Sequence, residues 1–113
     1  MLFSRKAPQL DPQDAAAAAE RGDLVLVDVR ESDERAEGHI LGSRHIPLGE
    51  LSNRLSELPA DTPAAFICRS GGRSSVATAE AAKRLRQVSD VRGGMIAWRA
   101  AGLPVTTHSP SGN

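Results

Sequence analysis

A short loop around the one cysteine of the chain holds the residue types best suited to chemistry. It reads Cys68-Arg69-Ser70-Gly71-Gly72-Arg73-Ser74 and lies between an apolar run that predicts a buried strand and a segment that predicts a helix. The glycines at 71 and 72 permit the backbone dihedrals of a tight cradle whose N–H groups face the sulfur. The positive end of the following helix and the guanidinium groups of Arg69 and Arg73 would lower the pKa of the thiol. We therefore expect an electropositive bowl that stabilises a thiolate, a persulfide anion or a bound oxyanion.

The sequence leaves more than one role open for the Cys68 loop. A lone cysteine at a strand end is often an inert buried residue. A phosphate-binding loop of the Walker type needs the pattern GxxxxGK[ST], which the sequence lacks. His39 or His45 would form a Cys–His pair if either approached Cys68, although a loop and a strand end account for both histidines.

The elements around this loop predict an α/β fold. Continuous apolar runs at residues 24–29 and 64–68 predict strands buried on both faces, and shorter strands are expected at 43–46 and 90–92. Helices are expected from Pro12 to Gly22 with Asp11 as the cap, from Ser32 to Glu37, over 51–58, from Ser74 to about Val88, and over 95–101. Strands that alternate with helices indicate a parallel sheet with helices on both faces. Ligands bind such sheets at the carboxyl ends of the strands, where Cys68 is expected.

The composition excludes several classes of protein. The chain has 113 residues, which fits one domain, and its 14 Lys and Arg balance its 14 Asp and Glu. With that balance and only 3% aromatic residues, we expect no nucleic-acid partner and no membrane partner. A single cysteine forms neither an internal disulfide nor a cysteine-rich metal site, so no metal and no cofactor are expected. The sequence suggests a cytoplasmic location, because no segment is typical of a signal peptide or a membrane span.

Four segments resemble the rhodanese family, and they follow one another in the family's order. They are Leu26-Val27-Asp28-Val29-Arg30, Glu37-Gly38-His39-Ile40 with Gly42-Ser43-Arg44-His45-Ile46-Pro47, the Cys68 loop, and Val91-Arg92-Gly93-Gly94-Met95-Ile96-Ala97-Trp98. The resemblance implies a single rhodanese-type domain over residues 8–105, followed by a flexible tail over 106–113. It also implies a five-stranded, mainly parallel sheet with helices on both faces.

The same resemblance implies a sulfurtransferase that carries sulfane sulfur as a persulfide on Cys68. Arg69, Ser70, Gly71, Gly72, Arg73 and Ser74 are then expected to bind the substrate, with Ser74 able to reach the sulfur. Asp28 and Arg30 are expected to support the loop, with Arg30 paired to an acid such as Glu37. Trp98 is expected in the core. The partners would be a small anionic sulfur donor such as thiosulfate, and a thiol, cyanide or a dithiol protein as acceptor.

Two alternatives remain beside sulfur transfer. Phosphatases and arsenate reductases of this fold use a longer Cys-x5-Arg loop, whereas Cys68 and Arg73 give Cys-x4-Arg, which suits a single sulfur atom. Rhodanese-like domains also serve as non-enzymatic regulatory modules or as sulfur carriers dedicated to one partner. The presence of Cys68 favours chemistry over a purely regulatory role.

Overall fold

A five-stranded parallel sheet forms the centre of the molecule. The computed structural model describes residues 8–84 and 87–108. Its strands are β1 (Gln9–Leu10), β2 (Val25–Asp28), β3 (Arg44–His45), β4 (Ala64–Ile67) and β5 (Val88–Val91), in the spatial order β1-β5-β4-β2-β3. Every pairing between neighbouring strands is parallel. The predicted α/β architecture with a five-stranded, mainly parallel sheet is therefore confirmed.

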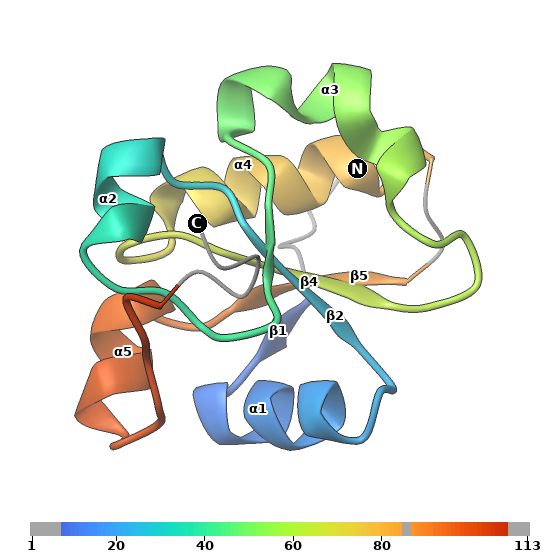
Figure 1. The fold of residues 1–113 in the computed structure, drawn as a ribbon. Coiled ribbons are helices and arrows are strands. Elements are labelled where there is room, and N and C mark those ends of the chain that lie inside the picture. Colours follow the sequence, from blue (N-terminus) through green and yellow to red (C-terminus); the bar gives the residue numbers. More distant parts are fainter. Residues whose placement is uncertain (1–7, 85–86, 109–113) are drawn as a thin grey trace, which may run out of the picture.

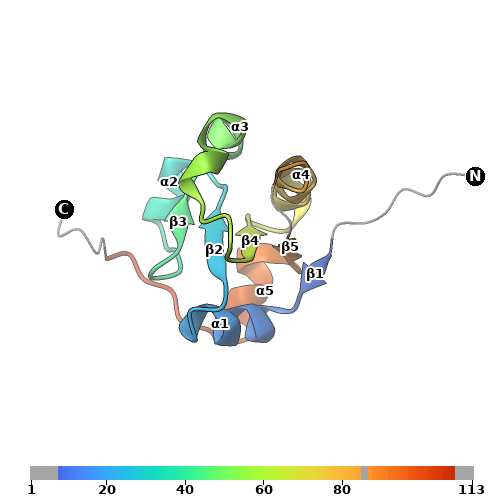
Figure 2. The ribbon, with the colours of Figure 1, turned by 90° about the vertical axis from the view of Figure 1, so that its right-hand side faces the viewer.

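Helices cover both faces of the sheet. They are α1 (Pro12–Glu20), α2 (Ser32–Ala36), α3 (Leu51–Arg54), α4 (Gly72–Ala81) and α5 (Gly94–Ala100). Figure 2 shows α3 and α4 on one side of the sheet and α1 and α5 on the other. The short helix α2 lies near the N-terminal end of α4, on the side of the molecule where β2 and β4 end (Figure 1).

Side-chain alternation along the strands divides the core into two layers. Val27 and Phe66 pack with the leucines of the α3 segment, whereas Leu26 and Ile67 pack with Met95 and Trp98 of α5. This division follows from the period of two along a strand, which sends successive side chains to opposite faces. Trp98 is 2% exposed, as expected of a core residue, and its indole N–H donates to the Pro104 carbonyl at 3.0 Å.

Three predicted helical features differ from the structure. The helix expected over 74–88 begins at Gly72 and ends at Ala81; residues 85–86 lie outside the described residues, and Val88 belongs to β5. The helix expected over 51–58 is one turn of α-helix followed by a 3₁₀ turn at Leu55–Glu57, although Leu51, Leu55 and Leu58 are all buried. Asp11 precedes α1 but makes no side-chain cap; its carboxylate accepts from Arg92 Nε at 2.9 Å instead.

The expected tail begins in contact with the domain. Thr106 pairs with His39 through two backbone hydrogen bonds of 2.9 and 2.8 Å, and residues 109–113 lie outside the described part of the chain. In residues 8–84 and 87–108, no helix has both the length and the apolar character that crossing a membrane would require.

Candidate active site

Cys68 lies directly after β4, at the carboxyl edge of the sheet. The four residues of β4 are all buried, and Cys68 itself is 1% exposed. The chain then turns through Arg69 and Ser70, and α4 begins at Gly72. Gly71 makes this turn possible, because its φ of 121° lies in a region that side chains with a Cβ rarely adopt. Gly72 is already helical, so the turn requires only the first of the two glycines.

Hydrogen-bond donors surround the sulfur on its loop side. The Gly71 N–H donates to Sγ at 3.1 Å, and the Ser74 hydroxyl oxygen lies 3.4 Å from Sγ. Burial raises the pKa of the Cys68 thiol, but its hydrogen bond with the Ser74 hydroxyl and the hydrogen bonds from the N–H groups of Ser74, Gly71 and Ser70 outweigh it, and the net shift is downward. The loop therefore favours the thiolate, the reactive form of a cysteine.

Ser74 is held from behind by a buried carboxylate. Its hydroxyl contacts Asp90 Oδ1 of β5, and the other carboxylate oxygen of Asp90 accepts from Gln9 Nε2 at 3.3 Å. Asp90 is 2% exposed and Ser74 is fully buried. This contact fixes the serine side chain against the sulfur, and it joins the loop to β5.

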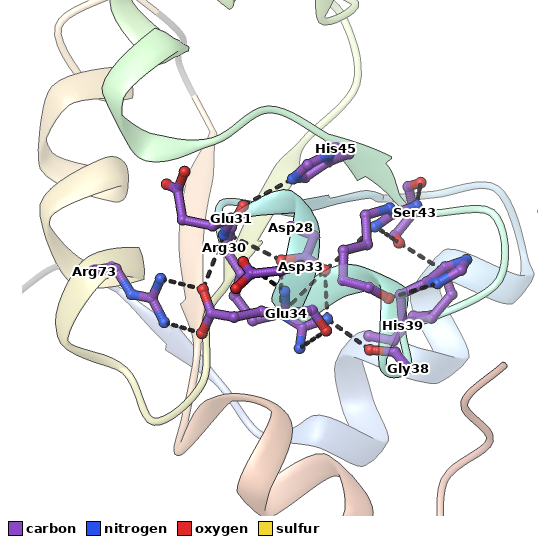
Figure 3. Close-up of polar contacts among 12 residues, drawn as sticks. Asp28, Arg30, Glu31, Asp33, Glu34, Gly38, His39, Ser43, His45 and Arg73 are labelled. Atoms are coloured by element: carbon purple, nitrogen blue, oxygen red, sulfur yellow. Dashed lines mark hydrogen bonds and ion pairs between the residues drawn. The ribbon is translucent and has the colours of Figure 1, made fainter. Parts of the chain in front are cut away.

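Arg73 and Arg69 differ in what surrounds them. The Arg73 guanidinium makes a two-point ion pair with Glu34 of α2, with both N–O distances at 2.7 Å (Figure 3). The hydrogen bonds from Arg73 lower the pKa of Glu34 to about 2, and Glu34 in turn raises the pKa of Arg73. Arg69 is exposed. The predicted positive charge on the loop is thus partly balanced by an acid from another element.

Asp28 and Arg30 form a buried pair that holds the segment bearing Glu34. Asp28 is 1% exposed and accepts from Arg30 Nη2 at 2.7 Å, while Arg30 also donates to the Glu34 carbonyl at 3.2 Å and the Gly38 carbonyl at 2.8 Å. Arg35 Nη1 adds a hydrogen bond to Asp28 at 3.3 Å. The expected pairing of Arg30 with Glu37 is wrong: Asp28 is closer along the chain and already buried, and Glu37 is exposed.

The start of α5 holds the other side of the loop. The N–H groups of Met95 and Ile96 donate to the carbonyls of Cys68 and Arg69 at 2.8 and 3.0 Å. These bonds point the carbonyls away from the sulfur and leave the amides of the turn to face it. Gly94 permits this approach, because a Cβ there would lie 2.4 Å from the Cys68 carbonyl oxygen.

In the described part of the chain, neither His39 nor His45 hydrogen-bonds to Cys68. The His39 ring nitrogen Nδ1 lies 3.2 Å from the Arg35 carbonyl oxygen, and His45 Nε2 lies 2.8 Å from the Arg30 carbonyl oxygen. Both imidazoles therefore support the segment around α2 (Figure 3).

The sequence does not predict the roles of three residues around the loop, namely Glu34, Asp90 and Gly94. Glu34 is separated from Arg73 by 39 positions, and Asp90 from Ser74 by 16, so no local pattern links either pair. A polar residue inside a short apolar strand is the available signal for Asp90. The pair Gly93-Gly94 predicts only a turn, and its close approach to the loop depends on the tertiary fold.

Comparison with known proteins agrees with this geometry. The family model of the rhodanese-like domain matches residues 11–101, so the chain belongs to that family. A sulfurtransferase of Allochromatium vinosum is 39% identical over 88 residues, covering 77% of this chain and 82% of that protein. The HTH-type transcriptional regulator Rv0324 of Mycobacterium tuberculosis is 38% identical over 112 residues, covering 90% of this chain; the chain spans about half of that regulator, 49%. A crystal structure of a rhodanese-related protein from Thermoplasma volcanium superposes with a TM-score of 0.83 at 30% identity, covering 89% of this chain and 99% of that one.

Proposed function

We propose that the protein is a sulfurtransferase that carries sulfane sulfur as a persulfide on Cys68. The observation that carries this proposal is the Gly71 N–H directed at Sγ at 3.1 Å, within a loop that lowers the pKa of the thiol. Membership of the rhodanese-like family and likeness to a protein named sulfurtransferase support it.

The proposed reaction has two steps with Cys68 as nucleophile. With thiosulfate, the Cys68 thiolate attacks the outer sulfur, the S–S bond of the donor breaks, and its electron pair leaves on sulfite. The persulfide anion of Cys68 then passes its outer sulfur to a nucleophilic acceptor such as cyanide, a thiol or a dithiol protein, and the thiolate is restored. Covalent catalysis of this kind divides one difficult transfer into two easier ones.

The loop supplies the remaining roles in this proposal. The N–H groups of Ser70, Gly71 and Ser74 hold the anionic sulfur, and Gly72 starts the helix whose positive end faces it. Arg69 attracts the donor and balances charge that develops on the leaving group. Arg73 lines the same rim with its charge shared by Glu34. Asp28 and Arg30 act at a distance, by fixing the segment that carries Glu34.

The acceptor lies outside these 113 residues. Cys68 is the one cysteine in the sequence, so the persulfide is not resolved by an internal disulfide. A lone thiol with a lowered pKa also suits a reducing compartment such as the cytoplasm.

A second candidate is a regulatory or partner-dedicated sulfur carrier of the same fold. The likeness over 90% of this chain to a transcriptional regulator favours it. Phosphatase or arsenate reductase activity is less well supported, since the loop has the shorter Cys-x4-Arg spacing and Glu34 occupies the guanidinium that would grip an oxyanion.

Turnover assays on one preparation separate these functions. We expect sulfur transfer from thiosulfate or a thiol persulfide to cyanide or dithiothreitol, and no hydrolysis of an aryl phosphate. Phosphate hydrolysis that depends on Cys68 would overturn the assignment. Stoichiometric loading of Cys68 without turnover on any of these acceptors would favour the dedicated carrier.

A further inference from the structure

The ion pair between Glu34 and Arg73 joins two elements at the mouth of the candidate site. Glu34 belongs to α2 and Arg73 to the first turn of α4, and two N–O contacts of 2.7 Å connect them (Figure 3). Their side chains are 28% and 35% exposed. Glu34 Oε1 also accepts from the Glu31 N–H at 2.9 Å, so the carboxylate has a fixed place at the start of α2. With a pKa of about 2, Glu34 stays ionised at every physiological pH.

This pair changes the charge that the loop offers to a donor. Arg73 has the planar fork that matches a carboxylate or a sulfonate-like oxyanion, and Glu34 already occupies two of its donors. Arg69 is the other side-chain cation of the loop, and it makes no ion pair with any residue of 8–84 and 87–108. The α2 segment adds further acids beside Glu34, namely the exposed Glu31 and Asp33.

We propose that Glu34 is a specificity-determining residue that turns the site away from thiosulfate and toward persulfides of thiols. Thiosulfate carries two negative charges and releases sulfite with two, whereas a thiol persulfide carries at most one on its terminal sulfur. Glu34 compensates the charge of Arg73, whereas the charge of Arg69 is uncompensated. Such a rim loses less electrostatic stabilisation with a thiol persulfide, which carries at most one charge, than with thiosulfate, which carries two. This inference rests on the proposed function and assigns its donor class.

The step with a persulfide needs no further reactant. The Cys68 thiolate attacks the outer sulfur of R–S–S–H, a new S–S bond forms at Cys68, and the donor's S–S bond breaks. The electron pair of the broken bond leaves on R–S⁻, and the transferred sulfur keeps its proton. The thiol released by the donor is the reduced product, and Cys68 gains the sulfane sulfur that the donor loses.

Glu34→Gln isolates the charge of this residue from its shape. Glutamine keeps an oxygen for the Glu31 N–H but no longer balances the guanidinium. Glu37→Gln is the matched control. Glu37 directly follows the same helix and is exposed, so this substitution removes one negative charge without touching Arg73. The readout is the rate at which intact mass shows one added sulfur atom, with sodium thiosulfate or cysteine persulfide as donor at low ionic strength.

We expect unaltered protein to load from cysteine persulfide at least about tenfold faster than from thiosulfate at equal concentration. Glu34→Gln raises the thiosulfate rate roughly fivefold or more and changes the persulfide rate less than about twofold, while Glu37→Gln changes both by less than about twofold. Adding Arg73→Met to Glu34→Gln removes the gain, since the gain depends on the released guanidinium.

Two results would overturn the inference while leaving sulfur transfer intact. One is a thiosulfate rate equal to or above the persulfide rate in unaltered protein, a comparison that needs no variant. The other is a donor preference that Glu34→Gln leaves unchanged or shifts further from thiosulfate. If unaltered protein gains sulfur from neither donor, the proposed function itself fails, and this inference with it.

Discussion

Replacing Gly94 by alanine tests whether the start of α5 holds the Cys68 loop in its reactive form. A Cβ at this position would lie 2.4 Å from the Cys68 carbonyl oxygen and 2.6 Å from the Arg69 carbonyl oxygen. Both contacts are with backbone, so the loop and α5 must separate. The hydrogen bonds from the Met95 and Ile96 amides to those carbonyls, now 2.8 and 3.0 Å, would then lengthen or break.

The expected cost has two parts. Alanine in a left-handed backbone conformation, such as the φ of 60° at Gly94, costs about 1–2 kcal/mol. Loss of two buried hydrogen bonds adds about 1 kcal/mol each. We therefore expect Gly94→Ala to lower the free energy of unfolding by about 3–4 kcal/mol, a large part of the ~5–15 kcal/mol typical of a domain.

Gly102→Ala is the matched control for the backbone part alone. Gly102 has a similar φ of 74°, and a Cβ there would meet nothing within 4 Å. It should lose about 1–2 kcal/mol and load Cys68 with sulfur at the unaltered rate. Urea unfolding gives the stabilities, and intact mass gives the loading rate, which we expect to fall about tenfold or more in Gly94→Ala. Equal stability losses in the two variants, with unchanged loading in both, would refute the role given to α5.

Two further predictions concern the thiol and the buried ion pair. The ultraviolet absorbance of the Cys68 thiolate, measured against Cys68→Ser, should appear at lower pH in the folded protein than in urea, a clean measurement because the chain has no tyrosine. Because the pKa of the thiol is lower in the folded protein, the thiol adds stability above its unfolded pKa, and this contribution is lost as pH falls through the folded pKa. Ser74→Ala should move the titration midpoint of the folded protein to higher pH. An unmoved midpoint would contradict the hydrogen bond between the Ser74 hydroxyl and the sulfur. Asp28→Asn leaves Arg30 buried without its partner and should cost about 3–5 kcal/mol in urea unfolding. Asp23→Asn removes an exposed pair and should cost at most about 1 kcal/mol, so similar losses in the two variants would count against the buried pair as a support.

The sequence predicts the centre of the sheet well and its edges less well. The apolar runs at 24–29 and 64–68 correspond to β2 and β4, because a strand buried on both faces is nearly continuous in apolar side chains. β1 has only two residues and no pattern, and it forms by pairing with β5. Val88 continues the helical spacing of α4, yet it pairs with Ala64 in the sheet, a contact that periodicity does not encode.

The position of the candidate site was predictable, but its charge was not. A glycine-bearing loop between a buried strand and a helix places Cys68 at the carboxyl edge of the sheet, as the structure has it. The charge of Arg73 depends on Glu34, which reaches it from α2 across the fold. Asp28 and Arg30 fix that segment, so this buried ion pair also helps to place Glu34 beside Arg73.

The mass of the intact protein after exposure to a sulfur donor tests the central claim most directly. We predict that thiosulfate or cysteine persulfide adds the mass of one sulfur atom, that peptide mapping locates it on Cys68, and that cyanide or dithiothreitol removes it. Cys68→Ser, which should fold normally, should gain nothing under the same treatment. An unchanged mass in unaltered, reduced and folded protein with every donor would contradict the account.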